Sequence, residues 1–168
     1  IHEAMLAADE EMYNNGVVAV GDICNTADSI SIKQKSKIQY HNFIEVLGFI
    51  EDATSRFQSY QPVFNSFLQA GFSANTSIVP HAPYTVSSNM FHFINEASAG
   101  KIISIHNQEC GSEEEGENSK SGEVLRLYYH LNINTDFFQP FKKTSLQSYL
   151  PLINKPKTLL LVHNTFSK

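Results

Sequence analysis

Apolar residues along the chain alternate between helical and extended patterns. Residues 1–14 carry apolar side chains at helical spacing, and the Asn15-Gly16 pair that follows is typical of a helix end and turn. Residues 17–23 are mostly apolar and β-branched, as in a strand covered on both faces. Residues 38–49 form a second extended candidate. This first part of the chain therefore predicts one helix and two strands.

The same alternation continues to the end of the chain. Aromatic and aliphatic residues at helical spacing predict a helix over residues 53–70, with Gly71 as its stop. Three short apolar runs have the length of strands: residues 77–80, 101–106 and 158–162. Three more helices are predicted beside them: from Ser87 or Ser88 to about residue 99, at 123–131 and at 145–153. The polar, acidic stretch 111–122 predicts a disordered loop or a lid, and residues 132–144 a long irregular connection.

Alternating strands and helices indicate an α/β fold with a parallel sheet, either doubly wound or closed into a barrel. A polar or ionisable residue stands at or near the C-terminal end of each predicted strand: Asp22 and Asn25, Glu45, His81, His106 and His163. A (β/α) barrel builds its site from the C-terminal ends of several strands, whereas a doubly wound sheet concentrates its ligands at one switch point. We therefore predict a partial (β/α)8 TIM-type barrel of about five parallel strands with flanking helices, forming a single domain over residues 1–168.

Composition excludes several classes of partner. The formal net charge of -5 does not provide the excess of basic residues that binding to nucleic acid or to an anionic membrane requires. No apolar stretch approaches the roughly 20 residues that span a bilayer, so no membrane partner is expected. Lys33, Lys35 and Lys37 are the only local concentration of basic residues, and a solvated segment explains them better than a phosphate-binding patch.

The two cysteines, Cys24 and Cys110, lie far apart in sequence and form no CxxC motif. Free thiols in a cytoplasmic protein are therefore expected. Cys110 directly follows a candidate catalytic stretch, but the sequence around it carries no signature of a cysteine nucleophile.

The sharpest local motif joins His106 and Glu109 across the end of a predicted strand. An imidazole with a carboxylate three residues later can place both groups around one metal-bound water, which zinc would acidify to a pKa of roughly 7. The carboxylate could then carry protons between the water and a leaving group. The alternative is a surface histidine and a solvated glutamate that heads the acidic run 113–115.

Two other histidines stand in suggestive contexts. Pro80 and Pro83 fix the backbone around His81, as a site that must hold an imidazole would require, although a loop histidine between rigid turns fits as well. His163 closes a fully apolar strand and could equally be a satisfied core histidine. Of the isolated glutamates, Glu45 is the better candidate to face a site. The remaining histidines are interpreted as packing or surface residues: His2, His41, His92 and His130.

Together, the three histidine segments resemble a known family. VPHAPYT (79–85), ISIHNQE (103–109) and LLVHNT (160–165) occur in the same order as similar segments of the amidohydrolase superfamily, and NGVVAVGD (15–22) is similar to its second strand. The most similar branch is that of the aminohydrolases, which includes S-adenosylhomocysteine and methylthioadenosine deaminases, guanine deaminases and triazine chlorohydrolases.

The resemblance implies a role for each matched residue. His106 would bind the metal, which would be zinc or another divalent ion such as iron. Glu109 would act as general acid/base and meet the ring nitrogen of a purine-like or other N-heterocyclic small molecule. His163 would orient the attacking water where there is one metal, or ligate metal where there are two. His81 would contact the substrate.

The chain departs from the family pattern in three places. Asn107 and Gln108 replace a usual small or apolar pair, which leaves the substrate class open. The His-x-His pair of the first strand does not occur in this sequence, and the eighth-strand aspartate would follow Lys168. An internal segment of the barrel, lacking its first and last strands, is therefore expected to bind zinc weakly, to lack turnover alone and to self-associate through open edges.

The favoured prediction is thus a metal-dependent hydrolase of deaminase type that attacks an amidine-like or aromatic carbon with zinc-activated water. A chlorohydrolase or another hydrolytic amidohydrolase is an alternative with the same site. A non-catalytic binding or assembly module, derived from the barrel but without the metal, is an alternative of a different class.

Overall fold

Five parallel strands form the centre of the molecule. The computed structural model describes residues 1–48, 52–111, 113, 123–134 and 143–167. The strands are β1 (Ala19–Ile23), β2 (Gln39–Val46), β3 (Thr76–Pro80), β4 (Ile102–Asn107) and β5 (Thr158–His163). They pair in chain order, β1 with β2 and β3 in one sheet and β4 with β5 in a second, and every pairing is parallel. The backbone N–H of His106 donates to the backbone oxygen of His81 at 2.9 Å, so the C-terminal end of β4 lies beside the C-terminal end of β3.

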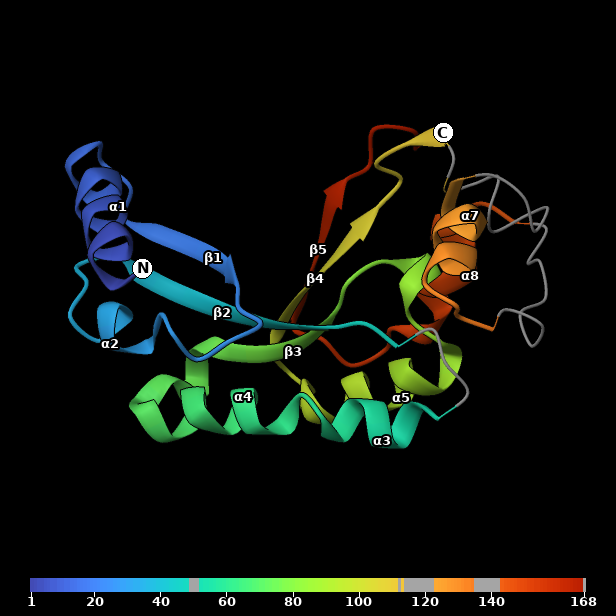
Figure 1. The fold of residues 1–168 in the computed structure, drawn as a ribbon, viewed down its shortest axis with the longest axis horizontal. Coiled ribbons are helices and arrows are strands. Elements are labelled where there is room, and N and C mark those ends of the chain that lie inside the picture. The colour runs from blue at the N-terminus through green and yellow to red at the C-terminus, as the bar shows by residue number, and fades with distance from the viewer. Residues whose placement is uncertain (49–51, 112, 114–122, 135–142, 168) are drawn as a thin grey trace.

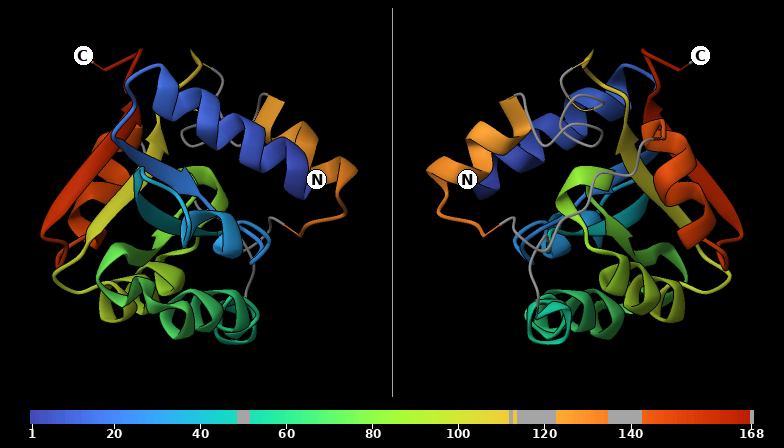
Figure 2. Two further views of the ribbon diagram at one scale, coloured as in Figure 1. Left: turned by 90° about the vertical axis from the view of Figure 1, so that its left-hand side faces the viewer. Right: turned by 90° about the vertical axis from the view of Figure 1, so that its right-hand side faces the viewer.

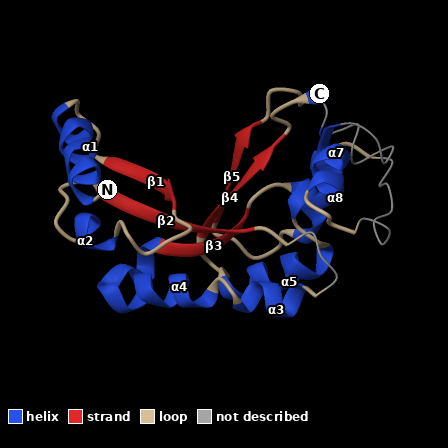
Figure 3. Ribbon diagram, viewed as in Figure 1, coloured by secondary structure: helices blue, strands red, loops and turns tan. Residues whose placement is uncertain are grey.

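Helices connect and flank these strands. Those described are α1 (His2–Asn14), α2 (Ile30–Lys33), α3 (Ala53–Gln58), α4 (Gln61–Phe67), α5 (Ser88–Ala97), α7 (Glu123–His130) and α8 (Ser145–Tyr149). Helices α3, α4 and α5 lie together on one side of β1–β3, and the β4–β5 pair crosses that sheet steeply (Figures 1 and 3). The end views show α1 on the opposite side of the strands from α4 (Figure 2). No helix among the described residues is long and apolar enough to cross a membrane.

Local sequence explains most element boundaries. Gly16 has a φ of 88° directly after α1, as the Asn15-Gly16 pair predicts. The Ser87 hydroxyl accepts the Met90 N–H and caps α5. The predicted single helix over 53–70 is wrong, because α3 ends at Gln58 and α4 begins with Pro62 in its first turn, where a proline without an N–H is tolerated.

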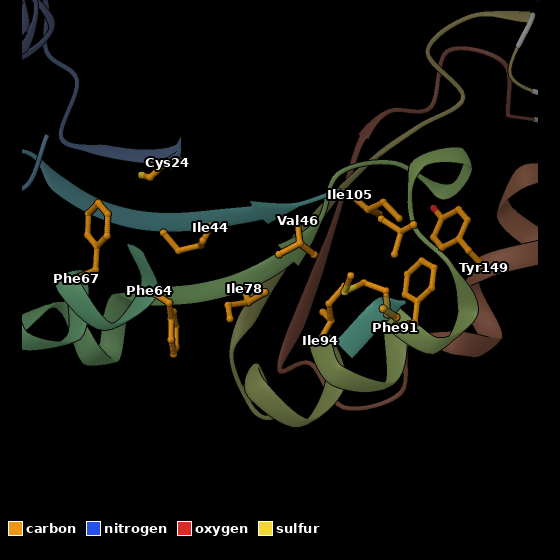
Figure 4. Close-up of a cluster of buried hydrophobic side chains, with 13 residues drawn as sticks. Cys24, Ile44, Val46, Phe64, Phe67, Ile78, Phe91, Ile94, Ile105 and Tyr149 are labelled. Carbon is orange, nitrogen blue, oxygen red and sulfur yellow. The ribbon is translucent and has the colours of Figure 1, made fainter. Parts of the chain in front are cut away.

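The main core lies between the β1–β3 sheet and the helices beneath it. Ile44 and Ile78 from the sheet are fully buried, and Phe67 of α4 and Ile94 of α5 pack in the same cluster from the helix side (Figure 4). Burial of large aliphatic and aromatic side chains contributes about 1.5 to 3 kcal/mol each, so this layer dominates the stability of the domain. A second, smaller cluster joins Phe43, Val79 and Ile103.

The outermost strands correct one prediction. Residues 17–23 were expected to be covered on both faces, but the residues of β1 alternate between exposed and half-buried, and Val18 before it is 70% exposed. β5 also contains only exposed and half-buried residues, and Leu160 is 43% exposed. Each of these strands has only one neighbouring strand in the described part of the chain, which leaves its other edge and outer face open.

One further predicted helix has different limits in the structure. The predicted helix at 145–153 ends at Tyr149 and continues as a tighter helical turn over Leu150–Leu152, where Pro151 removes a backbone donor. Most of the acidic stretch 111–122 and of the connection 132–144 lies outside the described residues.

Candidate active site

The carboxyl ends of the strands bring the predicted histidines together. The rings of His81 and His106 have centroids 5.5 Å apart, and those of His106 and His163 are 5.4 Å apart. This convergence follows from the parallel sheet, in which all strand ends that point the same way meet at one edge. The carboxylate of Asp22, which was also predicted at a strand end, pairs with Lys33 at 2.6 Å.

His106 and His163 are in direct contact. Nδ1 of His106 lies 3.3 Å from Nε2 of His163, and the register of β4 and β5 places Asn107 beside His163. The chain turns sharply after both histidines, because Gln108, His163 and Asn164 all have positive φ (51°, 72° and 51°). Non-glycine residues rarely adopt this conformation, and such strain concentrates at functional sites.

Glu109 completes the group from the loop after β4. Its Oε2 atom lies 3.6 Å from Nε2 of His163, and its side chain is 56% exposed. The carboxylate of Glu109 therefore lies beside His163 and remains open to solvent.

Glu113 anchors this loop and corrects another expectation. It lies in the stretch 111–122, which was expected to be a disordered loop or a lid, but its side chain is 2% exposed. Its Oε1 accepts the backbone N–H groups of Glu109 (2.8 Å) and Cys110 (3.2 Å), which holds the start of the loop in place. Sequence reasoning missed this role. The spacing of four residues between Glu109 and Glu113 was the available signal, since a carboxylate can cap the helical turn that precedes it.

Glu45 reaches the group from β2. It is 7% exposed, and its Oε1 lies 3.2 Å from Nε2 of His106. The two atoms are within ion-pair distance but are not aligned as a hydrogen bond. Oε1 therefore has no hydrogen-bond partner among the described residues although it is buried.

The tautomer of His81 follows from its neighbours. Its Nδ1 lies 2.9 Å from the hydroxyl of Thr85, and that hydroxyl donates its proton to the backbone oxygen of Ala82 at 3.0 Å. Nδ1–H must therefore be the donor to Thr85, which leaves Nε2 as an acceptor. Burial lowers the pKa of His81, against the opposing effect of the Glu45 carboxylate, and so favours the neutral ring.

Asn107 and Gln108 lie outside this group of side chains. Both are buried, and the Asn107 amide donates to the side-chain oxygen of Asn164 at 2.6 Å. Its own oxygen accepts from the Ser145 hydroxyl at 3.0 Å, while Ser167 donates to the Gln108 side chain at 2.6 Å. The unusual pair thus has a structural explanation: it links the segments that follow His106 and His163 at the ends of β4 and β5.

Lys33 corrects the interpretation of the basic segment. Its side chain is 3% exposed, and Nζ lies 2.6 Å from Asp22, 2.8 Å from the Asn42 side-chain oxygen and 3.0 Å from the sulfur of Cys24. Burial raises the pKa of Cys24 to about 11, although Lys33 acts against this shift. Cys24 is buried and Cys110 exposed, and neither forms a disulfide, as predicted.

The spacing of two histidine nitrogens fits one zinc ion. Two ligands at about 2.0 to 2.1 Å from a tetrahedral zinc are about 3.3 to 3.4 Å apart. The 3.3 Å between His106 Nδ1 and His163 Nε2 matches this separation. Within the described ranges, no group of three or more histidine, cysteine, aspartate or glutamate side chains is arranged to hold a metal ion. The separation of this pair would allow both nitrogens to ligate one ion, with its further ligands coming from outside the pair.

Comparison with solved structures reveals the same fold in a deaminase. Aminofutalosine deaminase from Helicobacter pylori, in complex with methylthio-coformycin, matches 97% of this chain at 20% identity with a TM-score of 0.78. A second structure of that enzyme matches 99% at 20% identity with a TM-score of 0.79. The chain spans about 40% of the length of this enzyme. No family model and no curated protein matches the sequence.

The likeness confirms the predicted fold class. The chain is an α/β protein with parallel strands and flanking helices, and it corresponds to part of a TIM-type barrel. β1, β2 and β3 lie side by side in chain order, a backbone hydrogen bond from His106 to His81 brings the end of β4 beside the end of β3, and β5 pairs with β4. This succession is that of a barrel, whereas a doubly wound sheet would place β4 beside β1.

Proposed function

We propose that the chain forms part of a metal-dependent hydrolase of deaminase type. The observation that carries the proposal is the 3.3 Å contact between His106 Nδ1 and His163 Nε2, with the Glu109 carboxylate 3.6 Å from the same His163 nitrogen. A nitrogen pair with the spacing of zinc ligands and an adjacent, solvent-accessible carboxylate are the components of metal-assisted hydrolysis.

His106 and His163 would hold the metal, which we take to be zinc or another divalent ion such as iron. When bound, zinc lowers the pKa of its water to about 7 and so supplies a nucleophile at neutral pH. Where a different set of ligands holds the ion, the same contact allows His163 to orient the attacking water through Nε2.

Glu109 would move the protons of the reaction. Its carboxylate is open to solvent and stands beside His163, so it can take a proton on the side of the attacking water and return it to a leaving nitrogen. The backbone hydrogen bonds to Glu113 fix the start of its loop, which limits the positions that this carboxylate can reach.

His81 would contribute to substrate binding. With its proton on Nδ1 and bound to Thr85, its Nε2 can accept a hydrogen bond from an N–H group of an amidine-like substrate. We infer a small-molecule substrate, purine-like or otherwise N-heterocyclic. The methylthio-coformycin bound by the structurally similar deaminase supports this class. Free thiols and the absence of an excess of basic residues for nucleic-acid binding are consistent with a cytoplasmic enzyme.

The isolated chain is expected to bind zinc weakly and to lack turnover. Zinc sites use three or four protein ligands, and the proposed pair supplies two. Deaminase or hydrolase activity in the purified chain that is lost in His106→Ala would contradict this expectation.

Zinc titration of the purified chain tests the proposal. Competition with a chelating dye should detect a site that is weakened at least tenfold in His106→Ala and in His163→Ala. His92→Ala is the matched control, because His92 is an exposed histidine of α5. Equal zinc binding by all four proteins would contradict the proposal, since the metal would then be held elsewhere.

A further inference from the structure

We propose that Glu45 is a positioning residue that keeps the proton of neutral His106 on Nε2, so that Nδ1 presents its lone pair toward His163. The metal-binding consequence rests on the function proposed above. The tautomer itself does not, because it follows from the contacts of His106 with other side chains.

The carboxylate of Glu45 is buried beside the imidazole without another described partner. Glu45 is 7% exposed, and its Oε1 atom has no hydrogen bond among the described residues. A buried carboxylate that is left without donors is costly, so any donor within reach is favoured strongly. Nε2 of His106 lies 3.2 Å away, and a modest rotation of the ring would align an N–H with this oxygen.

The backbone fixes the carboxylate in this place. Glu45 lies within β2, where it pairs in register with Val79 of β3, and the residues on either side of it, Ile44 and Val46, are fully buried in the main core. The carboxylate therefore belongs to a rigid strand, whereas Glu109 extends from a loop. A rigid partner of this kind can select one orientation of a neighbouring ring.

A neutral imidazole carries one N–H proton, so a proton on one ring nitrogen leaves the other nitrogen with a lone pair. With the proton on Nε2, the ring donates to Glu45 and the Nδ1 lone pair faces Nε2 of His163 at 3.3 Å. With the proton on Nδ1, a lone pair would face the buried carboxylate and the proton would occupy the gap between the two histidines. Only the first tautomer satisfies Glu45 and leaves Nδ1 available as a ligand. Partner carboxylates of this kind orient many metal-binding histidines.

The tautomer can be measured directly in the metal-free chain. Long-range proton–nitrogen correlation spectra of the ¹⁵N-labelled protein, at a pH where the imidazole is neutral, should show His106 protonated on Nε2. Glu45→Gln keeps an acceptor oxygen and should retain this tautomer, whereas Glu45→Leu should shift the population toward Nδ1–H. Glu96→Leu is the control, because Glu96 is an exposed glutamate that pairs with Lys155.

Zinc titration of the same variants gives the second readout. Glu45→Leu should weaken zinc binding by roughly 10- to 100-fold, Glu45→Gln should recover most of the affinity, and Glu96→Leu should have no effect. A merely structural role would weaken folding in Glu45→Leu without changing the tautomer of the folded molecules.

The outcomes separate this inference from the proposed function. Protonation of His106 on Nδ1 in the unaltered chain overturns the inference, even if Glu45→Leu fails to fold. The same holds if the Nε2–H tautomer persists in folded Glu45→Leu. If the tautomer behaves as expected but no protein binds zinc through His106, the positioning role stands and the proposed metal site fails.

Discussion

The side-chain amide of Asn107 donates a 2.6 Å hydrogen bond to the side-chain oxygen of Asn164. Each asparagine directly follows a histidine of the candidate site, His106 on β4 and His163 on β5. The bond therefore joins the two strand ends one residue beyond the two imidazoles, and it fixes the separation of the backbones that carry them.

Replacement of Asn107 should destabilise the fold. Asn107→Leu leaves the half-buried Asn164 oxygen and the buried Ser145 hydroxyl without this partner, which should lower the free energy of unfolding by about 2 to 3 kcal/mol. Urea denaturation followed by circular dichroism measures the change. Asn14→Leu, at an exposed position of α1, is the control and should change stability by less than about 0.5 kcal/mol. Equal stabilities of the two variants would contradict the structural role of Asn107.

Lys33 should be as sensitive to substitution as an apolar core residue. Lys33→Met keeps the length of the side chain but removes the cation from Asp22 and the donor from the buried Asn42 oxygen. The expected loss of stability is about 2 to 4 kcal/mol, reduced from the full effect of a broken buried pair because Asp22 is 39% exposed. Lys35→Met, at an exposed position two residues away, should be nearly neutral in the same urea experiment. A neutral Lys33→Met would show that the lysine is solvated.

The sequence alone predicts much of the fold because its strongest signals are periodic. Each described strand overlaps a predicted apolar run, and the stops at Gly16 and Gly71 both have positive φ (88° and 93°). The grouping of His81, His106 and His163 was also predictable, since parallel strands place their carboxyl ends at one edge.

The environments of single polar residues were not predictable in this way. Asn107 bonds a residue 57 positions away in the chain, and Glu45 of β2 meets His106 of β4, which belongs to the other sheet. Lys33 lies in a basic segment that resembles a solvated surface, and only the fold places it over Asp22 and Asn42. Such contacts depend on tertiary structure, so a composition or spacing argument contains no information about them.

His41 should make stability depend on pH. Its Nε2 lies 3.0 Å from the Ser77 hydroxyl, and burial lowers its pKa from the ordinary value of 6.5, with Lys101 acting in the same direction. Because the folded state favours the neutral ring, the stabilisation is fully present above pH 6.5. It is lost as the pH falls through the lowered folded-state pKa, where the unfolded chain binds the proton more readily.

Urea denaturation at about pH 7.5 and about pH 5.5 tests this effect. The fall in unfolding free energy between the two pH values should be smaller in His41→Gln than in the unaltered chain. His92→Gln, at an exposed histidine, should retain the full pH dependence. An unchanged pH dependence in His41→Gln would show that other groups account for it.

The open edges of β1 and β5 should make the chain self-associate. Each strand lacks a neighbour on one side among the described residues, and unpaired strand edges are templates for pairing with another chain. Apolar residues accompany both edges, with Val18 70% and Leu160 43% exposed. Sedimentation velocity should therefore show a sedimentation coefficient that rises with protein concentration.

Charged substitutions distinguish pairing of strand edges from non-specific apolar association. Val18→Lys beside β1 and Leu160→Lys in β5 should each reduce association, because a lysine at an edge opposes strand pairing. Leu127→Lys is the matched control, since Leu127 is 49% exposed but lies on helix α7. If all three variants reduce association equally, apolar contacts of any kind drive it. A monodisperse monomer at high concentration would show that the two edges are protected, and the prediction would fail.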